Sequence, residues 1–126
     1  MNLWSYNKKR EMETQSKIPV TESIYLKENE VYCRHLYDEI LYLEASGSYC
    51  YIYFSNNLRK VFAISLAELQ EYLPTEIFNR THRAFIVNIH HIERILGNTI
   101  YIGEAEIPIG REYRKDIFSR LNIVGL

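Results

Sequence analysis

The residues best suited to chemistry in this chain lie in one short stretch, residues 78–88. Its first half carries Arg80, His82 and Arg83, whose side chains donate hydrogen bonds and carry, or can gain, positive charge. Its second half, residues 85–87, is an apolar and largely β-branched run typical of a strand in a sheet interior. Burying that run would fix the backbone and present His82 and Arg83 at a defined place on the surface. The stretch therefore predicts recognition of a polyanion.

Catalytic and metal-binding functions find little support in the sequence. A hydrolase needs a nucleophile beside a base that a third group orients, and the chain has no Gly-x-Ser-x-Gly turn, Cys/His signature or phosphate-binding Gly-rich loop. His90 and His91 are adjacent, and in a strand they would point to opposite faces. Cys33 and Cys50 lie in apolar runs, which predicts small buried hydrophobes in a reducing compartment. We therefore expect no enzyme activity, no metal and no cofactor.

The length and charge of the chain limit its architecture. At 126 residues it suits one domain. No apolar run approaches the length of a membrane span, and the first ten residues lack the apolar core of a secretory signal, so we expect a cytoplasmic protein. The formal net charge is -1, whereas non-specific nucleic-acid binders are usually basic overall. Any cationic surface must therefore be local, and the arginines of the second half of the chain favour a one-sided footprint.

Periodicity predicts a mainly β fold. Short runs rich in Ile, Val and Tyr alternate with polar breaks, which is typical of antiparallel strands; they are residues 24–26, 31–37, 40–45, 49–54 and 58–64. In residues 49–54, alternation places Cys50, Ile52 and Phe54 on the core face. The opposite face then carries Tyr49, Tyr51 and Tyr53.

Helix and turn signals complete this outline. Ser65 and Glu68 form a capping-box pattern that predicts a short helix ending before Pro74. The dipeptide 97–98, Gly-Asn, predicts a hairpin between strands at residues 92–96 and 99–102. Beyond Gly110 the apolar spacing becomes helical, so we expect a C-terminal helix. Residues 1–22 are polar and mixed in charge, and we expect a tail or linker there, followed by one domain over residues 23–126.

Several motifs together resemble the LytTR DNA-binding domain of bacterial transcriptional regulators. The stretch over residues 78–88 reads Phe-x-Arg-x-His-Arg-x-Phe-Ile-Val-Asn, and three flanking motifs occur in the family's order: Ile40-Leu41-Tyr42-Leu43-Glu44-Ala45 with Gly47-Ser48-Tyr49, then Ser65-Leu66-Ala67-Glu68-Leu69, then Ile107-Pro108-Ile109-Gly110-Arg111-x-Tyr113. The resemblance covers roughly residues 24–124. Ala84 and Gly110 stand where the family commonly has serine, and Gly110 could weaken a helix cap.

The resemblance implies an elongated stack of short antiparallel sheets, with one short internal helix and a C-terminal helix, whose loops rather than a recognition helix enter double-stranded DNA. It implies sequence-specific binding at promoters for transcription regulation. Two copies would commonly bind direct repeats, with loops in successive grooves and bending of the duplex. In this family the domain usually follows a receiver or a membrane sensor. Neither fits in the first 20 or so residues, so two alternatives stay open: a stand-alone regulator, or a piece of a longer protein with an upstream sensor or receiver as its partner.

Arg83 is the first candidate for reading a base. Its guanidinium can make two parallel hydrogen bonds to guanine O6 and N7, or to a phosphate; a surface pair with a glutamate is the alternative. His82 can donate to a phosphate or a base, but can equally bond the neighbouring backbone. Two interpretations of Arg80 stay open: a structural ion pair with Glu76 or Glu44, or a role in the polyanion site.

The other candidates rest on the resemblance. It places a DNA-contacting loop at Ser48 and Tyr49, where the Ser48 hydroxyl can reach a phosphate and Tyr49 can instead pack on its neighbours. It places a base or phosphate contact at Arg111, which can also be simply solvated. Arg114 and Lys115 can add phosphate contacts, although charges on a helix surface are commonly only solvated.

Two other functions stay open. A protein interaction module derived from the same fold would agree with the near-neutral charge and with the face of tyrosines, because tyrosine is common at interfaces. RNA binding is a weaker choice, since the glycine-aromatic signatures of RNA-stacking sheets are missing. A continuous positive potential over Ser48, Arg83 and Arg111 would favour DNA.

Overall fold

The computed structural model describes residues 22–125. The predicted tail, residues 1–22, lies outside this part of the chain except for Glu22, so the proposed tail and domain boundary stays a prediction. Within the described residues, strands dominate and the paired strands of each sheet run antiparallel. The predicted mainly β architecture is confirmed.

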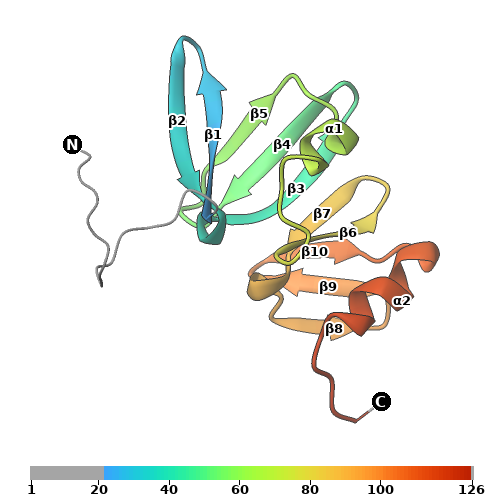
Figure 1. Cartoon of the computed structure of the whole chain (residues 1–126). Helices are drawn as coiled ribbons and strands as arrows, with labels where there is room; N and C mark the ends of the chain where they lie inside the picture. Colours follow the sequence, from blue (N-terminus) through green and yellow to red (C-terminus); the bar gives the residue numbers. More distant parts are fainter. Residues whose placement is uncertain (1–21, 126) are drawn as a thin grey trace, which may run out of the picture.

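The strands form three sheets (Figure 1). The first is a hairpin of β1 (Ser23–Glu28) and β2 (Val31–Leu36). The second has five strands in the order β5 (Arg59–Phe62), β4 (Tyr49–Phe54), β3 (Ile40–Ser46), β7 (Phe85–Asn88) and β6 (Phe78–His82). The third has the order β10 (Ala105–Pro108), β9 (Thr99–Ile102) and β8 (Arg94–Leu96).

The helices are short. The internal helix α1 (Leu66–Gln70) begins where predicted, because the Ser65 hydroxyl accepts a hydrogen bond from the Glu68 amide at 3.0 Å. The C-terminal helix α2 is Arg111–Ser119. Single 3-10 turns precede β3 and follow β7, namely η2 (Tyr37–Glu39) and η3 (Ile89–His91). The expectation that His90 and His91 lie in a strand was therefore wrong; both belong to η3.

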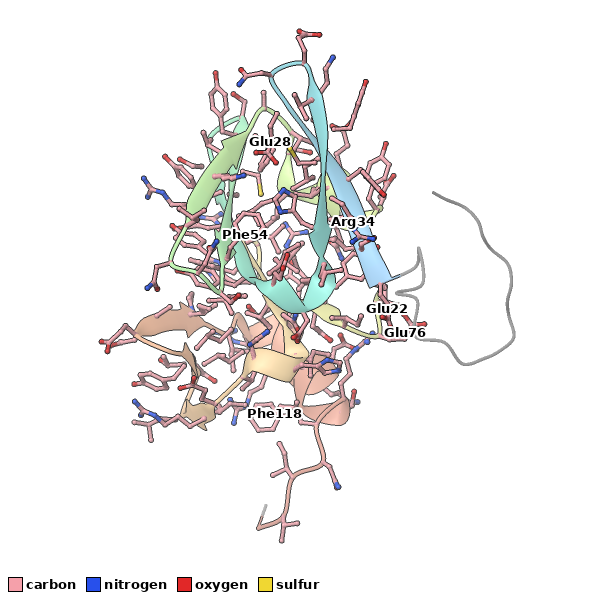
Figure 2. All side chains as sticks on the ribbon, turned by 90° about the vertical axis from the view of Figure 1, so that its left-hand side faces the viewer. Glu22, Glu28, Arg34, Phe54, Glu76 and Phe118 are labelled. Atoms are coloured by element: carbon pink, nitrogen blue, oxygen red, sulfur yellow. The ribbon has the colours of Figure 1, made fainter. Side chains whose placement is uncertain are left out.

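Two hydrophobic cores are stacked along the long axis of the molecule. The first packs the β1–β2 hairpin and α1 on one face of the five-stranded sheet, and it includes the predicted core residues Cys50, Ile52 and Phe54. The second lies between β7, the third sheet and α2. Figure 2 shows Phe54 and Phe118 in the two successive layers.

Strand β7 belongs to both cores. Ile86 lies in the first core and is 1% exposed, while Val87 lies in the second and is 0% exposed. Burying each side chain contributes about 1.5–3 kcal/mol to folding. The strand that follows Arg83 is thus fixed from both faces, as the sequence predicted for the run over residues 85–87.

Candidate nucleic-acid interface

Three chain connections meet at one edge of the molecule, on the right in Figure 1. They are the β3–β4 turn, the β6–β7 turn and the junction of β10 with α2. The Ala45 amide donates to the Ala84 carbonyl at 2.8 Å, which ties the β6–β7 turn to the end of β3. The Gly110 amide donates to the Thr81 carbonyl at 2.7 Å, which ties the α2 junction to β6. The β6–β7 turn therefore lies between the other two connections.

A fourth connection, the β8–β9 turn, joins the same edge. The Ile109 amide donates to the Asn98 carbonyl at 2.8 Å, so the residues leading into α2 are also held to this turn. The predicted Gly97–Asn98 hairpin is confirmed, with Gly97 at a φ of 61°. We call the four connections together the turn edge: residues 46–49, 82–85, 96–99 and 108–111.

The β6–β7 turn carries the two leading candidates. Its closing pair is His82 with Phe85, so Arg83 and Ala84 form a two-residue loop. The pairing shifts register between Arg80 and His82, which makes Thr81 the extra residue of a β-bulge. Bulges bend a strand and re-aim the side chains beside them. Arg83 is exposed at the tip of this turn.

His82 is fixed by the backbone of its own turn. Its Nδ1 accepts a hydrogen bond from the Ala84 amide at 3.1 Å, and its ring meets the Phe85 ring edge-on, with 5.9 Å between centroids. Because an amide can only donate, Nδ1 is the acceptor and the neutral ring carries its proton on Nε2. The structural reading of His82 thus holds, and it leaves an oriented N–H donor.

Arg80 has a structural role, but with other partners than predicted. Its Nε donates to the His82 carbonyl at 3.0 Å and its Nη2 to the Arg83 carbonyl at 2.6 Å. Its Nη1 donates to Gln70 Oε1 at 2.6 Å. An ion pair with Glu76 or Glu44, one of the two interpretations that the sequence left open, is therefore not what holds Arg80. Sequence reasoning missed these partners because backbone carbonyls leave no trace in a charge pattern.

The β3–β4 turn presents Ser48 and Tyr49 at the turn edge. Gly47 occupies the first loop position with a φ of 62°, as a tight hairpin requires. Ser48 is exposed, and Tyr49 is 52% exposed. Tyr49 therefore leaves about half of its side chain available to a partner.

The N-terminal half of α2 presents Arg111 and Lys115, both exposed, together with the exposed carboxylate of Glu112 in its first turn. Gly110 is the N-cap residue and makes no side-chain capping bond, as expected from the missing serine. Arg114 differs from these two residues. Its Nη1 donates to the Gly97 carbonyl at 2.8 Å and to Asn98 Oδ1 at 2.7 Å, so it ties α2 to the β8–β9 turn.

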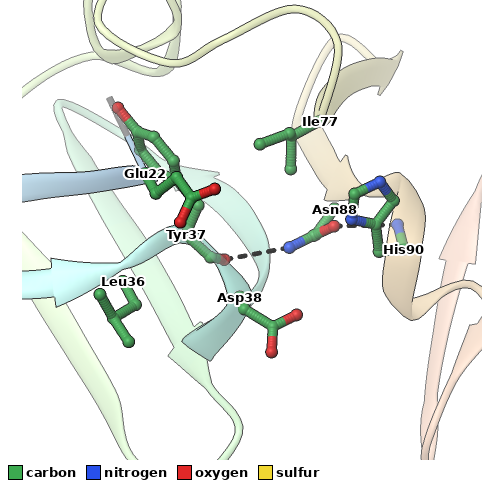
Figure 3. Close-up of a pocket in the computed structure, with 7 residues that line it drawn as sticks. All are labelled: Glu22, Leu36, Tyr37, Asp38, Ile77, Asn88 and His90. Carbon is green, nitrogen blue, oxygen red and sulfur yellow. Dashed lines mark hydrogen bonds between the residues drawn. The ribbon is translucent and has the colours of Figure 1, made fainter. Parts of the chain in front are cut away.

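Acidic groups gather at the other end of the central strands. η2 precedes β3, so it lies at the end of that strand opposite the β3–β4 turn. A hollow of about 220 Å³ there is lined by Glu22, Asp38 and His90, among others (Figure 3). Asn88 also lines this hollow, and its Nδ2 donates to the Tyr37 carbonyl at 3.0 Å. Arg83 lies at the opposite end of the central strands from this hollow, while Glu112 places one exposed carboxylate in the first turn of α2 beside Arg111.

The tyrosine face predicted on β4 exists beside the turn edge. Tyr42 and Tyr53 stack with 4.2 Å between ring centroids, and the Tyr53 hydroxyl donates to Glu44 at 2.9 Å. Burial, with smaller effects from Tyr53 and Glu44, raises the pKa of Tyr42 to about 12. The Arg59 guanidinium lies 4.4 Å from the centre of the Tyr51 ring. This face carries the Glu44 carboxylate as well as the Arg59 guanidinium, and Glu44 is paired in register with Phe85 of β7.

Metal ligands and membrane spans are both missing from the described part of the chain. Between residues 22 and 125, no group of three or more His, Cys, Asp or Glu side chains is arranged to hold a metal ion. Over the same residues, no helix is long and apolar enough to cross a membrane. Cys33 and Cys50 are free thiols, half-buried and buried respectively.

Comparison with known proteins identifies the family. The model of the LytTr DNA-binding domain matches residues 30–122. Among solved structures, the chain is similar to the LytTr DNA-binding domain from a Bacillus cereus protein described as a methyl-accepting/DNA response regulator, with 26% identity and a TM-score of 0.66 over 81% of this chain and 98% of that one. No curated protein matches the chain. Because the family model matches most of its residues, the chain belongs to the LytTR family of DNA-binding domains.

Proposed function

We propose that this domain binds double-stranded DNA sequence-specifically through the turn edge and thereby regulates transcription. One observation carries the proposal. Two backbone hydrogen bonds, from Ala45 to Ala84 and from Gly110 to Thr81, hold three connections side by side, and Ser48, Arg83 and Arg111 are exposed on them. These connections carry the predicted DNA-binding residues Ser48, Tyr49, His82, Arg83 and Arg111. A rigid edge with separated donors suits one face of a duplex.

The residues divide between reading and positioning. Arg83 reads a base, because its guanidinium is exposed at a fixed turn and can bond two acceptors of guanine. His82 offers its Nε2 proton to a base or phosphate. Ser48, Arg111 and Lys115 contact phosphates, which fix register without carrying sequence information. Arg114 can add a phosphate contact with the donors that the β8–β9 turn leaves free.

The larger arrangement follows the family. One set of loops enters a major groove and the next set lies one helical turn away, with phosphate contacts across the intervening minor groove and bending of the duplex. Two copies on direct repeats extend the footprint at a promoter. The domain works in the cytoplasm, under a sensor or receiver that supplies the signal.

The test starts from an oligonucleotide selection with the wild-type protein. Competition gel shifts then compare the selected duplex with a scrambled one. We expect Arg83→Ala to lose about 1–3 kcal/mol of discrimination, whereas the matched control Arg34→Ala, an exposed arginine of β2, keeps it. Undiminished discrimination by Arg83→Ala would refute the assignment. Arg114→Ala should make the salt dependence shallower by about one unit if it also touches a phosphate.

A protein interaction module is the second candidate, and the face around Tyr51 favours it. Val61 is 53% exposed beside the stacked pair of Arg59 and Tyr51, and tyrosine and arginine are enriched at interfaces. If the folded protein selects no duplex from a random pool, the DNA proposal fails and this module becomes the working hypothesis. Selection of one sequence family supports DNA binding instead.

A further inference from the structure

The β6–β7 turn is an exception among the hairpins of this domain. The other two-residue turns of the described chain begin with Asn29, Gly47, Gly97 or Gly103, each at a φ between 58° and 62°. A positive φ at that position matches the twist of paired strands. Neither Arg83 nor Ala84 has a positive φ. This turn therefore lacks the backbone geometry that makes a hairpin turn stable by itself, and something else must hold it.

The Arg80 side chain supplies that support. Nε and Nη2 lie on one side of the planar guanidinium, and they donate to the carbonyls of His82 and Arg83 at 3.0 and 2.6 Å. A guanidinium presents its donors in a fixed fork, so the two carbonyls are held at a fixed spacing. Lysine, with a single ammonium on a flexible stem, cannot hold both carbonyls in the same way.

The fork itself is anchored on α1. Arg80 Nη1 donates to Gln70 Oε1 at 2.6 Å, and Gln70 is the last residue of α1. The helix is packed into the first core by Leu66 and Leu69, each 3% exposed. A chain of direct contacts therefore runs from that core through Gln70 and Arg80 to the backbone that presents Arg83.

We infer that Arg80 and Gln70 are positioning residues for DNA reading: they set the shape of the β6–β7 turn and act on DNA only through His82 and Arg83. The inference rests on the proposed DNA binding. It extends the set of residues that determine specificity to a helix side chain outside the turn edge. A direct phosphate contact by Arg80, through its two remaining N–H groups, is the competing explanation.

The experiment uses the duplex selected by the wild-type protein and a scrambled duplex. Arg80→Lys keeps the charge and loses the fork; its discrimination should fall by about 5- to 150-fold, the range of one lost base contact. The discrimination of Gln70→Ala should also fall below that of the wild type. Gln70→Glu keeps an acceptor for Arg80, so its discrimination should match the wild type. Arg34→Lys is the matched control and should match the wild type.

Salt dependence separates positioning from phosphate contact. On scrambled DNA, Arg80→Gln should keep the wild-type slope of log Kobs against log salt. A slope smaller by about 0.9, the value for one lost phosphate contact, would overturn the inference. Wild-type discrimination by Arg80→Lys would overturn it as well.

Amide hydrogen exchange tests, in the absence of DNA, whether Arg80 stabilises the β6–β7 turn. The Ala45 amide, which donates to the Ala84 carbonyl, should exchange faster in Arg80→Lys. The Ile109 amide, which donates to Asn98, should not change. If wild-type protein selects no duplex, the proposed function fails, while unchanged exchange at Ala45 contradicts the role of Arg80 itself.

Discussion

Replacing Asn88 with alanine removes a side chain that connects three segments of the fold. Asn88 is 0% exposed. Its Nδ2 donates to the carbonyls of Tyr37 at 3.0 Å and Ile40 at 2.9 Å, and its Oδ1 accepts from the His90 amide at 2.9 Å. These bonds join η2, the start of β3 and η3. The substitution therefore leaves two carbonyls and one amide without their partners.

The magnitude follows from these bonds. Each hydrogen bond contributes about 0.5–1.5 kcal/mol net, with a central value of about 1 kcal/mol. Three such bonds give a loss of about 3 kcal/mol in the free energy of unfolding. Asn88→Asp should cost more than the alanine variant, because it places carboxylate oxygens against two carbonyl oxygens in a buried site.

Urea unfolding followed by circular dichroism measures this loss. Asn56→Ala is the matched control, since Asn56 is exposed and its side chain accepts only from the Leu58 amide at 3.2 Å; its loss should stay below about 0.5 kcal/mol. If Asn88→Ala costs as little as Asn56→Ala, or if Asn88→Asp is the milder of the two Asn88 variants, the reasoning from buried hydrogen bonds is wrong.

Three more predictions follow from individual contacts. Ser65→Ala removes the N-cap of α1 and should lower the free energy of unfolding by about 1 kcal/mol in the same urea assay, whereas an unchanged value would mean that the cap adds nothing. Hydrogen bonds from Lys60 and His35 hold the pKa of Glu28 below its usual value. The stabilisation from these bonds is therefore complete above the pKa that Glu28 has in the unfolded chain, and it is lost as the pH falls through the lower pKa that Glu28 has in the folded protein. The stability difference between wild type and Lys60→Met should therefore shrink between about pH 5 and pH 3, and a constant difference would contradict it. Burial raises the pKa of the Cys50 thiol to about 11, so iodoacetamide at neutral pH should modify Cys33 first; equal rates in mass spectrometry would contradict this order.

Local patterns were enough to predict most elements of the fold. Alternation in β4 correctly separated buried Cys50 from exposed Tyr49, and Gly97 correctly marked a hairpin. Ser65 correctly marked the start of a helix. These features depend on neighbours in sequence, which a single chain displays. The 3-10 turn around His90 was missed. Asn88 caps it locally by accepting from the His90 amide, but the bonds that hold the Asn88 side chain in place go to Tyr37 and Ile40, far away in the chain.

The candidate site was predictable by residue type but not by mechanism. The charge and planarity of Arg83 pointed to base reading, and the structure leaves that side chain exposed. Arg80 and Arg114 look identical to Arg83 in sequence. Each donates instead to carbonyl groups of a neighbouring turn, those of His82 and Gly97 among them. Such partners are set by tertiary approach and by the bulge at Thr81, which have no local signature.

The central pairing of the five-stranded sheet joins distant parts of the chain. β3 and β7 are neighbours, yet β4, β5, α1 and β6 intervene in sequence, and the Asn88 bond to Tyr37 spans 51 residues. Pairings of this kind require a long loop to close first, which slows folding. An N-terminal fragment ending before β6 would contain Ser48 but nothing to place beside it. The turn edge therefore forms only with the complete domain, so a partly synthesised chain lacks the surface proposed to bind DNA.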